Sequence, residues 1–268
     1  FVSDRMWRIL AEMYMKKVFS LNLGLVLILM ASLADAADPK DLIIHLPFEG
    51  NGKEVTDVSP NKFKGKVVGK AKSVEGVVGK ALEFGGGAAK FDPLKFDLPK
   101  AMTIEFWFKP SQKITGGSRM DLMYRASGGG RPHITFNRGG VLLGHYFATD
   151  KAELEIKSQA KEFDTKWYYY VATQTGSETV LYIDGEEDGK AAAGGSVRID
   201  FIEHGMSIAA NHEGGNNFNG AMDEVKIWNV ALTADEVKKS MQAALAPTTA
   251  VDSRNRLTTK WADIKFNR

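Results

Sequence analysis

The chain contains no cysteine, and this absence removes several kinds of chemistry. Without thiols there is no disulfide framework, no thiolate zinc site and no cysteine nucleophile. Proline is scarce, with 8 residues, whereas the 27 glycines indicate many tight turns. An excess of charge is also lacking, because 35 basic residues face 33 acidic ones. A net charge of only +2 without a basic stripe predicts that nucleic acid is not a partner.

A hydrophobic run near the N-terminus is too short for a comfortable membrane span, which needs about 20 residues. Two lysines precede the apolar stretch over 21–30, and an Ala-Asp-Ala triplet at 34–36 has the pattern of a cleavage site. These features predict a secretory signal peptide over 15–36, with residues 1–14 upstream of the natural start. We therefore expect a mature chain with no membrane span that is secreted, periplasmic or located at the cell surface.

Alternating apolar residues dominate the rest of the chain. Such runs occur at 42–48, 103–109, 180–183 and 224–228. A period of two is typical of half-buried strands, and glycine-rich turn signals separate the runs. Asp184-Gly185 has the composition of a type I′ hairpin turn, in which both central residues need a positive φ. Many short strands with little helix predict an all-β fold, a two-sheet antiparallel jelly-roll sandwich.

One helix is predicted near the C-terminus. Thr233 and Glu236 have the spacing of a capping box, and apolar residues follow at helical spacing. Pro247 is expected to stop this helix. The sandwich domain is therefore expected over 37–246. The polar, basic tail over 247–268 is a linker end, an interaction peptide or a strap on the domain.

Three separated segments contain motifs that follow one another in a characteristic order along the chain. They read GKALEFGGGAAKFDPLKFDLPKAMTIEFWFKP over 79–110, WYYYVATQTGSETVLYIDG over 167–185 and FNGAMDEVKIWNVALTADEV over 218–237. In this order they resemble the laminin-G-like domains of the concanavalin A-like lectin/glucanase superfamily, roughly over 41–246. Trp107, Trp167 and Trp228 occupy motif positions, so we expect them to pack. The resemblance implies the fold and leaves the function open, because this fold hosts lectins, adhesion modules, hydrolases and spacers.

Hydrolase relatives of that superfamily carry an E-x-D-x-x-E strand. Retaining hydrolysis needs two carboxyl groups about 5 Å apart across one cleft. The strand expected to carry them, over 119–125, contains one carboxylate, Asp121. Neither a G-x-S-x-G nor an H-E-x-x-H motif occurs in the chain. We therefore predict that the chain is not an enzyme, and a carbohydrate-active hydrolase is the least favoured alternative.

Aromatic and planar polar side chains around the Gly128–Gly130 loop are the candidate ligand-binding residues. They are Tyr124, Arg125, Arg131, His133, Asn137, His145 and Tyr146. Aromatic rings can lie against sugar C–H groups, and binding groups concentrate on loops. His133 and His145 are expected on neighbouring strands of a hairpin, where they share a ligand only if both point to one face. The polar loop over 211–217 is expected to form a rim or a flexible turn.

The resemblance also implies a structural calcium ion. Domains of this superfamily often carry one Ca²⁺, held by a carboxylate at the start of the D-E-V strand and by oxygens near the first strand. The matching residues are Asp223, and Glu49 with Gly50. Ca²⁺ prefers six to eight oxygen ligands, and a glycine-rich bend lets carbonyl groups converge. Alternatively, Asp223 caps a turn or pairs with a lysine.

These observations favour a secreted, non-catalytic module that binds a glycan or polysaccharide or acts in adhesion. The main alternative is a structural or protein-interaction domain without a sugar site, with segment 252–268 of the tail joining it to partners. In that case the partner would be a surface protein.

Overall fold

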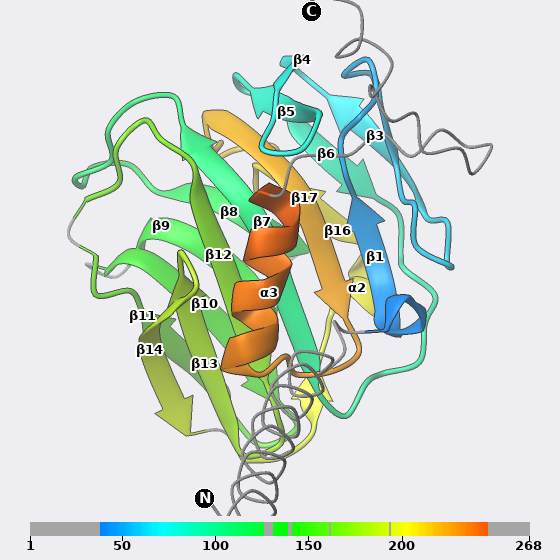
Figure 1. The fold of residues 1–268 in the computed structure, drawn as a ribbon, viewed down its shortest axis with the longest axis vertical. Helices are drawn as coiled ribbons and strands as arrows, with labels where there is room; N and C mark the ends of the chain where they lie inside the picture. Colours follow the sequence, from blue (N-terminus) through cyan, green and yellow to red (C-terminus); the bar gives the residue numbers. More distant parts are fainter. Residues whose placement is uncertain (1–37, 126–130, 139–140, 161, 193, 246–268) are drawn as a thin grey trace, which may run out of the picture. The chain divides into compact units, whose positions relative to one another are not determined.

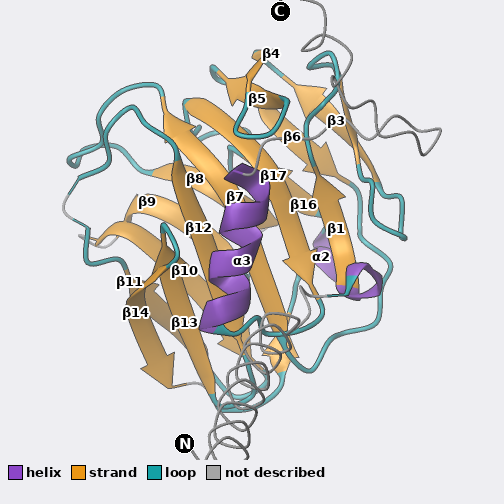
Figure 2. Cartoon of the chain, in the orientation of Figure 1, coloured by secondary structure: helices purple, strands orange, loops and turns teal. Residues whose placement is uncertain are grey.

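The computed structural model describes residues 38–125, 131–138, 141–160, 162–192 and 194–245. The predicted signal peptide, the segment before it, the C-terminal tail and the Gly128–Gly130 loop lie outside these residues. Strands in two antiparallel sheets dominate the described part, as Figure 2 shows, and this confirms the predicted sandwich. None of the described helices is long and apolar enough to cross a membrane.

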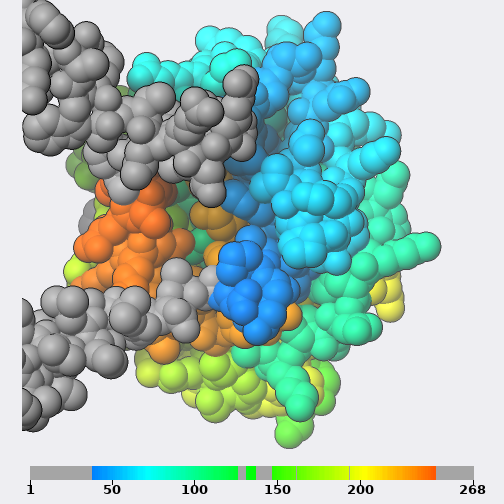
Figure 3. All heavy atoms as spheres, turned by 45° about the vertical axis from the view of Figure 1, so that its right-hand side comes forward, coloured from blue at the N-terminus to red at the C-terminus, as the bar shows by residue number. Residues whose placement is uncertain are grey.

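The first sheet has eight strands and contains both the first and the last strand of the fold. Its members are β1 (Leu42–Leu46), β4 (Ala71–Glu75), β5 (Lys80–Phe84), β7 (Met102–Pro110), β12 (Tyr168–Gln174), β13 (Glu178–Ile183), β14 (Glu186–Ala192) and β17 (Gly220–Trp228). Their order is β14-β13-β12-β7-β17-β5-β4, with β1 also paired to β17. The blue N-terminal and orange C-terminal segments therefore meet in Figure 3.

The second sheet has nine strands. They are β2 (Glu54–Thr56), β3 (Lys64–Val68), β6 (Ala88–Phe91), β8 (Met120–Arg125), β9 (His133–Arg138), β10 (Val141–Thr149), β11 (Glu153–Lys157), β15 (Val197–Arg198) and β16 (Met206–Ile208). The order is β11-β10-β9-β8-β16-β6-β3-β2, with β15 also paired to β10. The described helices are η1 (Pro39–Asp41), α2 (Phe201–His204) and α3 (Ala234–Leu245).

The core lies between the two sheets, and residue alternation along the strands accounts for it. Ile104, Phe106 and Phe108 of β7 are all fully buried. The ring of Phe108 lies 5.7 Å from that of Phe136 and 6.3 Å from that of Phe218, so aromatic side chains from different elements interlock. Burying one phenylalanine side chain contributes about 1.5–3 kcal/mol. A core of this kind explains how the fold holds together without disulfides.

Helix α3 covers the outer face of the eight-stranded sheet, where it crosses β7, β12 and β17 in Figure 1. Its predicted capping box is present. The backbone N–H of Thr233 donates to Glu236 Oε2 at 2.7 Å, and the N–H of Glu236 donates to Thr233 Oγ1 at 3.3 Å. The Asp184-Gly185 turn also has its predicted form, with φ values of 52° and 81°.

Charged side chains are buried beneath this helix. Glu105 on β7 is fully buried, and its carboxylate accepts hydrogen bonds from Tyr169 Oη at 2.5 Å and Ser240 Oγ at 3.0 Å. Lys226 Nζ lies 3.5 Å from Glu105 Oε1 and 3.0 Å from Glu224 Oε2. Burial lowers the pKa of Lys226, but the two carboxylates outweigh burial and raise it above its ordinary value. The helix is thus anchored to the sheet by a hydrogen bond to a buried, paired carboxylate.

Candidate functional site

A polar cluster lies on the outer face of the nine-stranded sheet, on β8 and β9. Residues three apart in a regular strand face opposite ways, which would separate Asp121 from Tyr124. A bulge between Asp121 and Met123 shifts the pairing by one residue and brings both side chains to one face. The rings of Tyr124 and His133 then meet edge to face, with centroids 4.3 Å apart. The bulge therefore assembles the cluster.

Asp121 is the centre of this cluster and is fully buried. His133 Nε2 lies 2.8 Å from Asp121 Oδ1, and Nε2 carries the proton because a carboxylate can only accept. Arg119 donates to the same carboxylate through Nε and Nη2, both at 2.9 Å. Burial raises the pKa of Asp121, yet the hydrogen bonds from His133 and Arg119 outweigh it and hold the pKa below its ordinary value. The ionised carboxylate fixes the orientation of both neighbours.

The glycine-rich loop that was expected to form a rim packs on this cluster. Asn211 Oδ1 accepts two backbone N–H groups of the loop, at 3.0 and 2.8 Å, and so holds the loop closed. The N–H of Asp121 donates to the carbonyl oxygen of Asn216 at 2.7 Å. The ring of His212 stacks on that of Tyr124, with centroids 5.7 Å apart and an interplanar angle of 19°. The loop and the strand therefore form one surface.

We refer to Arg119, Asp121, Tyr124, His133 and His212 as the Asp121 cluster. Its inner residues are buried and its outer residues are partly exposed. The side chains of Asp121 and His133 are inaccessible to solvent, whereas those of Arg119 and His212 are 31% and 28% exposed. Asp121 thus orients the guanidinium of Arg119, which reaches solvent, while the partly exposed imidazole of His212 is held by stacking on the buried ring of Tyr124. Such a surface can offer hydrogen-bond donors and ring faces together.

Two other predicted ligand residues belong to a different cluster, centred on Asp200. Arg125 Nη1 lies 3.8 Å from Asp200 Oδ2, and the backbone N–H of Arg131 donates to the same oxygen at 2.9 Å. Arg131 Nη2 also donates to Glu153 Oε2 at 2.7 Å. Arg198 completes the cluster with two hydrogen bonds to Asp200, at 2.8 and 3.2 Å. The structure therefore divides the predicted set of ligand residues between two places.

The remaining predicted residues lie on the expected hairpin of β9 and β10. The backbones of Asn137, His145 and Tyr146 are described, but their side chains fall outside the described ones. The register sets position 146 opposite His133, and position 145 opposite Ile134. Ligand contact by any of the seven residues stays a prediction.

Sequence reasoning missed Arg119, Asp121 and His212 as members of the site. One signal was available, because Arg119 and Asp121 are two residues apart and therefore share a strand face. The same Arg-x-Asp spacing recurs at Arg198 and Asp200, where it also forms a paired guanidinium and carboxylate.

Two of the three residues predicted to bind calcium, Asp223 and Glu49, meet at the turn between β4 and β5, whereas the third, Gly50, lies near the carbonyl oxygen of Glu54. Asp223 Oδ2 accepts the N–H groups of Val77 and Val78 at 2.8 and 3.0 Å, and Glu49 Oε1 accepts the N–H of Lys80 at 3.2 Å. A Cβ atom on the glycine at position 76 would lie 2.5 Å from Asp223 Oδ2. Asp223 on β17 and Glu49, which follows β1, thus contact one tight turn from segments that are distant in sequence.

The pKa of Asp223 is shifted in the direction opposite to that of Asp121. Burial, together with the charge of Glu224, raises the pKa of Asp223 to about 7, against the lowering effect of its backbone N–H partners. No group of three or more acidic or histidine side chains suited to a metal exists among the described residues. A cation at this turn would therefore need backbone carbonyl oxygens besides Asp223 and Glu49. Hard oxygen donors of this kind fit Ca²⁺.

Three solved structures of similar fold are domains of larger proteins. Domain 4 of AbnA, a GH43 extracellular arabinanase from Geobacillus stearothermophilus, in complex with arabinotriose, matches with a TM-score of 0.60 and 18% identity, over 74% of this chain and 97% of that one. The binding domain of botulinum neurotoxin DC in complex with SialylT has a TM-score of 0.60 and 14% identity, over 77% and 52%. The binding domain of Paraclostridial mosquitocidal protein 1 has a TM-score of 0.60 and 17% identity, over 76% and 52%.

This chain spans about half the length of the two toxin structures, and at these identities the likeness shows the fold alone. No curated protein sequence matches the chain. A family model does match, over residues 84–238, which is more than half of the 268 residues and includes the whole Asp121 cluster. The chain therefore belongs to the Laminin_G_3 family of the concanavalin A-like lectin/glucanases superfamily.

Proposed function

We propose that the chain is an exported, non-catalytic carbohydrate-binding module whose ligand contacts the outer face of the nine-stranded sheet at the Asp121 cluster. One observation carries this proposal: a buried carboxylate on an outer sheet face holds the partly exposed guanidinium of Arg119 beside the partly exposed ring of His212, which stacks on the buried ring of Tyr124. Two similar structures are complexes with arabinotriose and SialylT, which supports carbohydrate as the ligand class.

The energetic cost of the cluster supports a binding role. Placing an ionised Asp121 out of contact with water is expensive, and the ion pair with Arg119 offsets this cost only in part. An apolar pair of similar volume would often serve stability equally well at such a position. What the ionic pair adds is a guanidinium held in one geometry, ready to donate to sugar hydroxyl groups without further ordering.

The same electrostatics argues against acid catalysis at this cluster. A glycosidase acid has a raised pKa, so that it holds a proton near neutral pH. The pKa of Asp121 is lowered instead, by His133 and Arg119 acting against burial. The carboxylate therefore acts as a positioning group for its neighbours.

The test compares two arginines in matched settings. Arg119→Ala removes the guanidinium from the Asp121 cluster, and Arg198→Ala removes the equivalent guanidinium from Asp200 on the same sheet. The chain is first screened on a glycan array, and affinities for the best ligand are then measured by calorimetry. We expect Arg119→Ala to weaken binding at least tenfold, about 1.4 kcal/mol, while Arg198→Ala leaves it unchanged.

Two outcomes would contradict the proposal. If no glycan binds the wild-type chain, the carbohydrate assignment is wrong and a protein-interaction domain becomes the favoured function. If Arg198→Ala abolishes binding and Arg119→Ala does not, the Asp200 cluster is the site. Circular dichroism of both variants separates a loss of contacts from a loss of fold.

We also propose that a calcium ion binds at Asp223 and Glu49. The supporting observation is that the buried Asp223 and the exposed Glu49 contact the same turn; burial, and after it the charge of Glu224, raises the pKa of Asp223 to about 7. A divalent cation beside Asp223 would favour its ionised form and would tie the turn between β4 and β5 to β17. Glu49 follows β1, contacts the same turn and is exposed, so it can add a second anionic oxygen.

Thermal unfolding of EDTA-treated protein tests the calcium proposal. At a Ca²⁺ concentration 100 times its dissociation constant, binding stabilises the folded state by about 2.7 kcal/mol. We expect Tm to rise by about 5–10 °C for a domain of this size. The rise should disappear in Asp223→Asn and shrink in Glu49→Gln. A Tm that Ca²⁺ leaves unchanged in the wild-type chain would show that the turn binds no calcium.

A further inference from the structure

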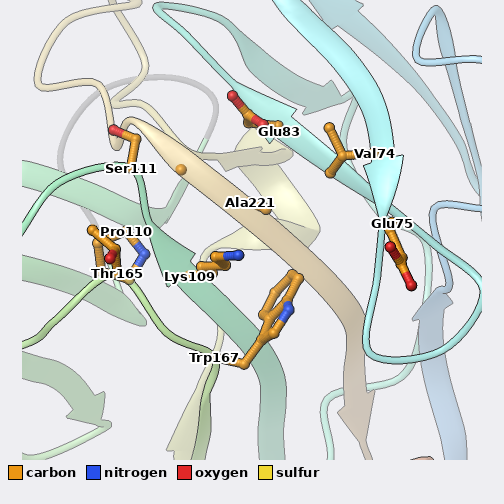
Figure 4. Close-up of a pocket in the computed structure, with 10 residues that line it drawn as sticks. Val74, Glu75, Glu83, Lys109, Pro110, Ser111, Thr165, Trp167 and Ala221 are labelled. Atoms are coloured by element: carbon orange, nitrogen blue, oxygen red, sulfur yellow. The ribbon is translucent and has the colours of Figure 1, made fainter.

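A trough lies on the outer face of the eight-stranded sheet, on the side of the sandwich opposite the Asp121 cluster. It encloses about 490 Å³ and crosses the ends of β4, β5, β17 and β7 beside the start of β12. Figure 4 shows Trp167 standing on one side of the trough and Glu83 with Val74 on the other, with Lys109 between them. The volume falls within the range of about 300–1,000 Å³ of small-ligand sites.

The trough exists because a short side chain stands between two long ones. The register sets Glu83 of β5 and Lys109 of β7 on either side of Ala221 of β17. These three side chains share one face, so the methyl group of Ala221 forms a low floor between taller neighbours. The preceding residue, Gly220, also lines the trough and adds no side chain to it.

Trp167 supplies an aromatic wall. It immediately precedes β12, whose first residue pairs with Phe108, so Trp167 extends the same row beyond Lys109. The sequence motif predicts a packing role for this tryptophan, but it is only half-buried and lines the trough. Trp107 and Trp228, in contrast, are 5% and 7% exposed and pack as expected. An indole face that borders an open trough is suited to apolar ring surfaces.

The charges of the trough balance one another. Glu75, Glu83 and Lys109 line it, and Lys72 Nζ lies 3.4 Å from Glu83 Oε1 at its edge. Two carboxylates and two ammonium groups leave no net charge to attract an anionic or cationic ligand. They do offer hydrogen-bond acceptors and donors, as does the hydroxyl group of Ser111. A neutral molecule with hydroxyl groups on one side and C–H groups on the other matches this lining.

We propose that this trough is a second binding site, for a neutral oligosaccharide, with Trp167 as its platform. The inference rests on the proposed function only for the class of ligand, since its residues and its face of the sandwich are separate. Sugar C–H groups pack on the indole, and hydroxyl groups exchange hydrogen bonds with Lys109 and Glu83. Two sites on opposite faces would let one domain bridge two polysaccharide chains, with the gain in avidity that linked sites provide.

Fluorine NMR of the full chain labelled with 5-fluorotryptophan reports on this site directly. The chain has five tryptophans, and Trp167→Phe assigns the resonance of Trp167. The probes are arabinotriose, maltotriose and cellotriose as neutral sugars, and trigalacturonate as an anionic one. We expect at least one neutral trisaccharide to shift the Trp167 resonance in a saturable way, and trigalacturonate to leave it in place.

Variants separate this site from the Asp121 cluster. Ala221→Val fills part of the trough with a residue that suits a strand. The affinity measured from the Trp167 resonance should fall at least tenfold. Lys190→Ala removes an exposed lysine elsewhere on the sheet, and Arg119→Ala alters the other face; both should leave the Trp167 titration unchanged.

The inference is overturned if no neutral trisaccharide moves the Trp167 resonance at tenfold above a dissociation constant of about 1 mM. It is also overturned if Ala221→Val titrates like the wild-type chain, or if trigalacturonate binds as well as the neutral sugars. If only the proposal for the Asp121 cluster is wrong, the chain will still bind glycans on the array, and Arg119→Ala will not reduce that binding. The Trp167 titration will then be unchanged.

Discussion

The two outer faces of the sandwich both bury charged side chains, but they do so under different covers. On the eight-stranded sheet, Glu105 and Lys226 lie beneath helix α3, and Ser240 of that helix donates directly to Glu105. On the nine-stranded sheet, Asp121 lies beneath a loop, and its partner Arg119 remains partly exposed. The first network has its centre at Glu105 beneath the helix and continues through Lys226 and Glu224 to His45, whose side chain is 21% exposed. The second ends at Arg119, whose side chain is 31% exposed.

This difference indicates what each network does. A fully buried carboxylate that a helix residue contacts directly acts within the fold, by fixing how α3 sits on the sheet. A network whose last member reaches solvent can hold that member in place for a ligand. The comparison predicts large stability effects on the helix-covered face, and combined stability and binding effects on the loop-covered face.

The largest effect is expected from Glu105→Ala. This substitution leaves Lys226 without its Glu105 partner and removes the acceptor for the Tyr169 and Ser240 hydroxyl groups. Breaking a buried pair from one side costs about 3–5 kcal/mol. Urea denaturation should report this loss in the free energy of unfolding. A cost below about 1 kcal/mol would mean that the helix-covered network contributes no more than an exposed ion pair.

A matched control for that experiment is Glu178→Ala. Glu178 lies on the same sheet and pairs with Lys190 at 2.5 Å, but both side chains are 42% or more exposed. Exposed pairs of this kind contribute little, because water and salt screen them. We expect no measurable change in the free energy of unfolding, so the contrast with Glu105→Ala isolates burial as the cause.

An intermediate effect is expected from Asp121→Asn. The substitution keeps the shape of the side chain but removes the charge that pairs with Arg119 and accepts from His133. Leaving such groups incompletely satisfied costs about 1–3 kcal/mol at pH 7. Glycan binding should fall as well, because the guanidinium loses its fixed orientation. Unchanged binding together with reduced stability would assign this cluster a purely structural role.

The pH dependence of the free energy of unfolding sharpens this prediction. The folded pKa of Asp121 is lowered from the ordinary 3.8, so the unfolded state takes up the proton first as pH falls. The contribution of Asp121 is therefore complete above about pH 4 and declines as pH drops toward the folded pKa. Unfolding measured between pH 7 and pH 3 should show this decline in the wild-type chain. The corresponding part of the slope should be absent in Asp121→Asn.

Much of the fold could be predicted because its signals are local. The alternation of Ile104, Phe106 and Phe108 predicts a buried strand, and Asp184-Gly185 predicts a turn. Each of these patterns depends on residues within a few positions of one another. The family resemblance adds the order of the strands, which local patterns do not contain.

The site was less predictable because it depends on register. His133 meets Asp121 and Tyr124 only because a bulge shifts the pairing of β8 with β9, and no residue pattern marked that bulge. Lys226 meets Glu105 through the pairing of β17 with β7, across more than one hundred residues of sequence. Local alternation places Glu105 on the face of its strand opposite Ile104 and Phe106, and only the covering helix makes that face a buried one.

The smallest effect is expected at the start of the covering helix. Thr233→Ala removes the side chain that accepts the N–H of Glu236, and the loss of a helix cap costs about 1 kcal/mol. Because α3 covers the eight-stranded sheet, the free energy of unfolding should fall by that amount while glycan binding at the Asp121 cluster stays unchanged. Urea denaturation and calorimetry on the same sample test both parts. Weaker glycan binding in Thr233→Ala would mean that the two faces are coupled through the core, and the separation of their roles would then be wrong.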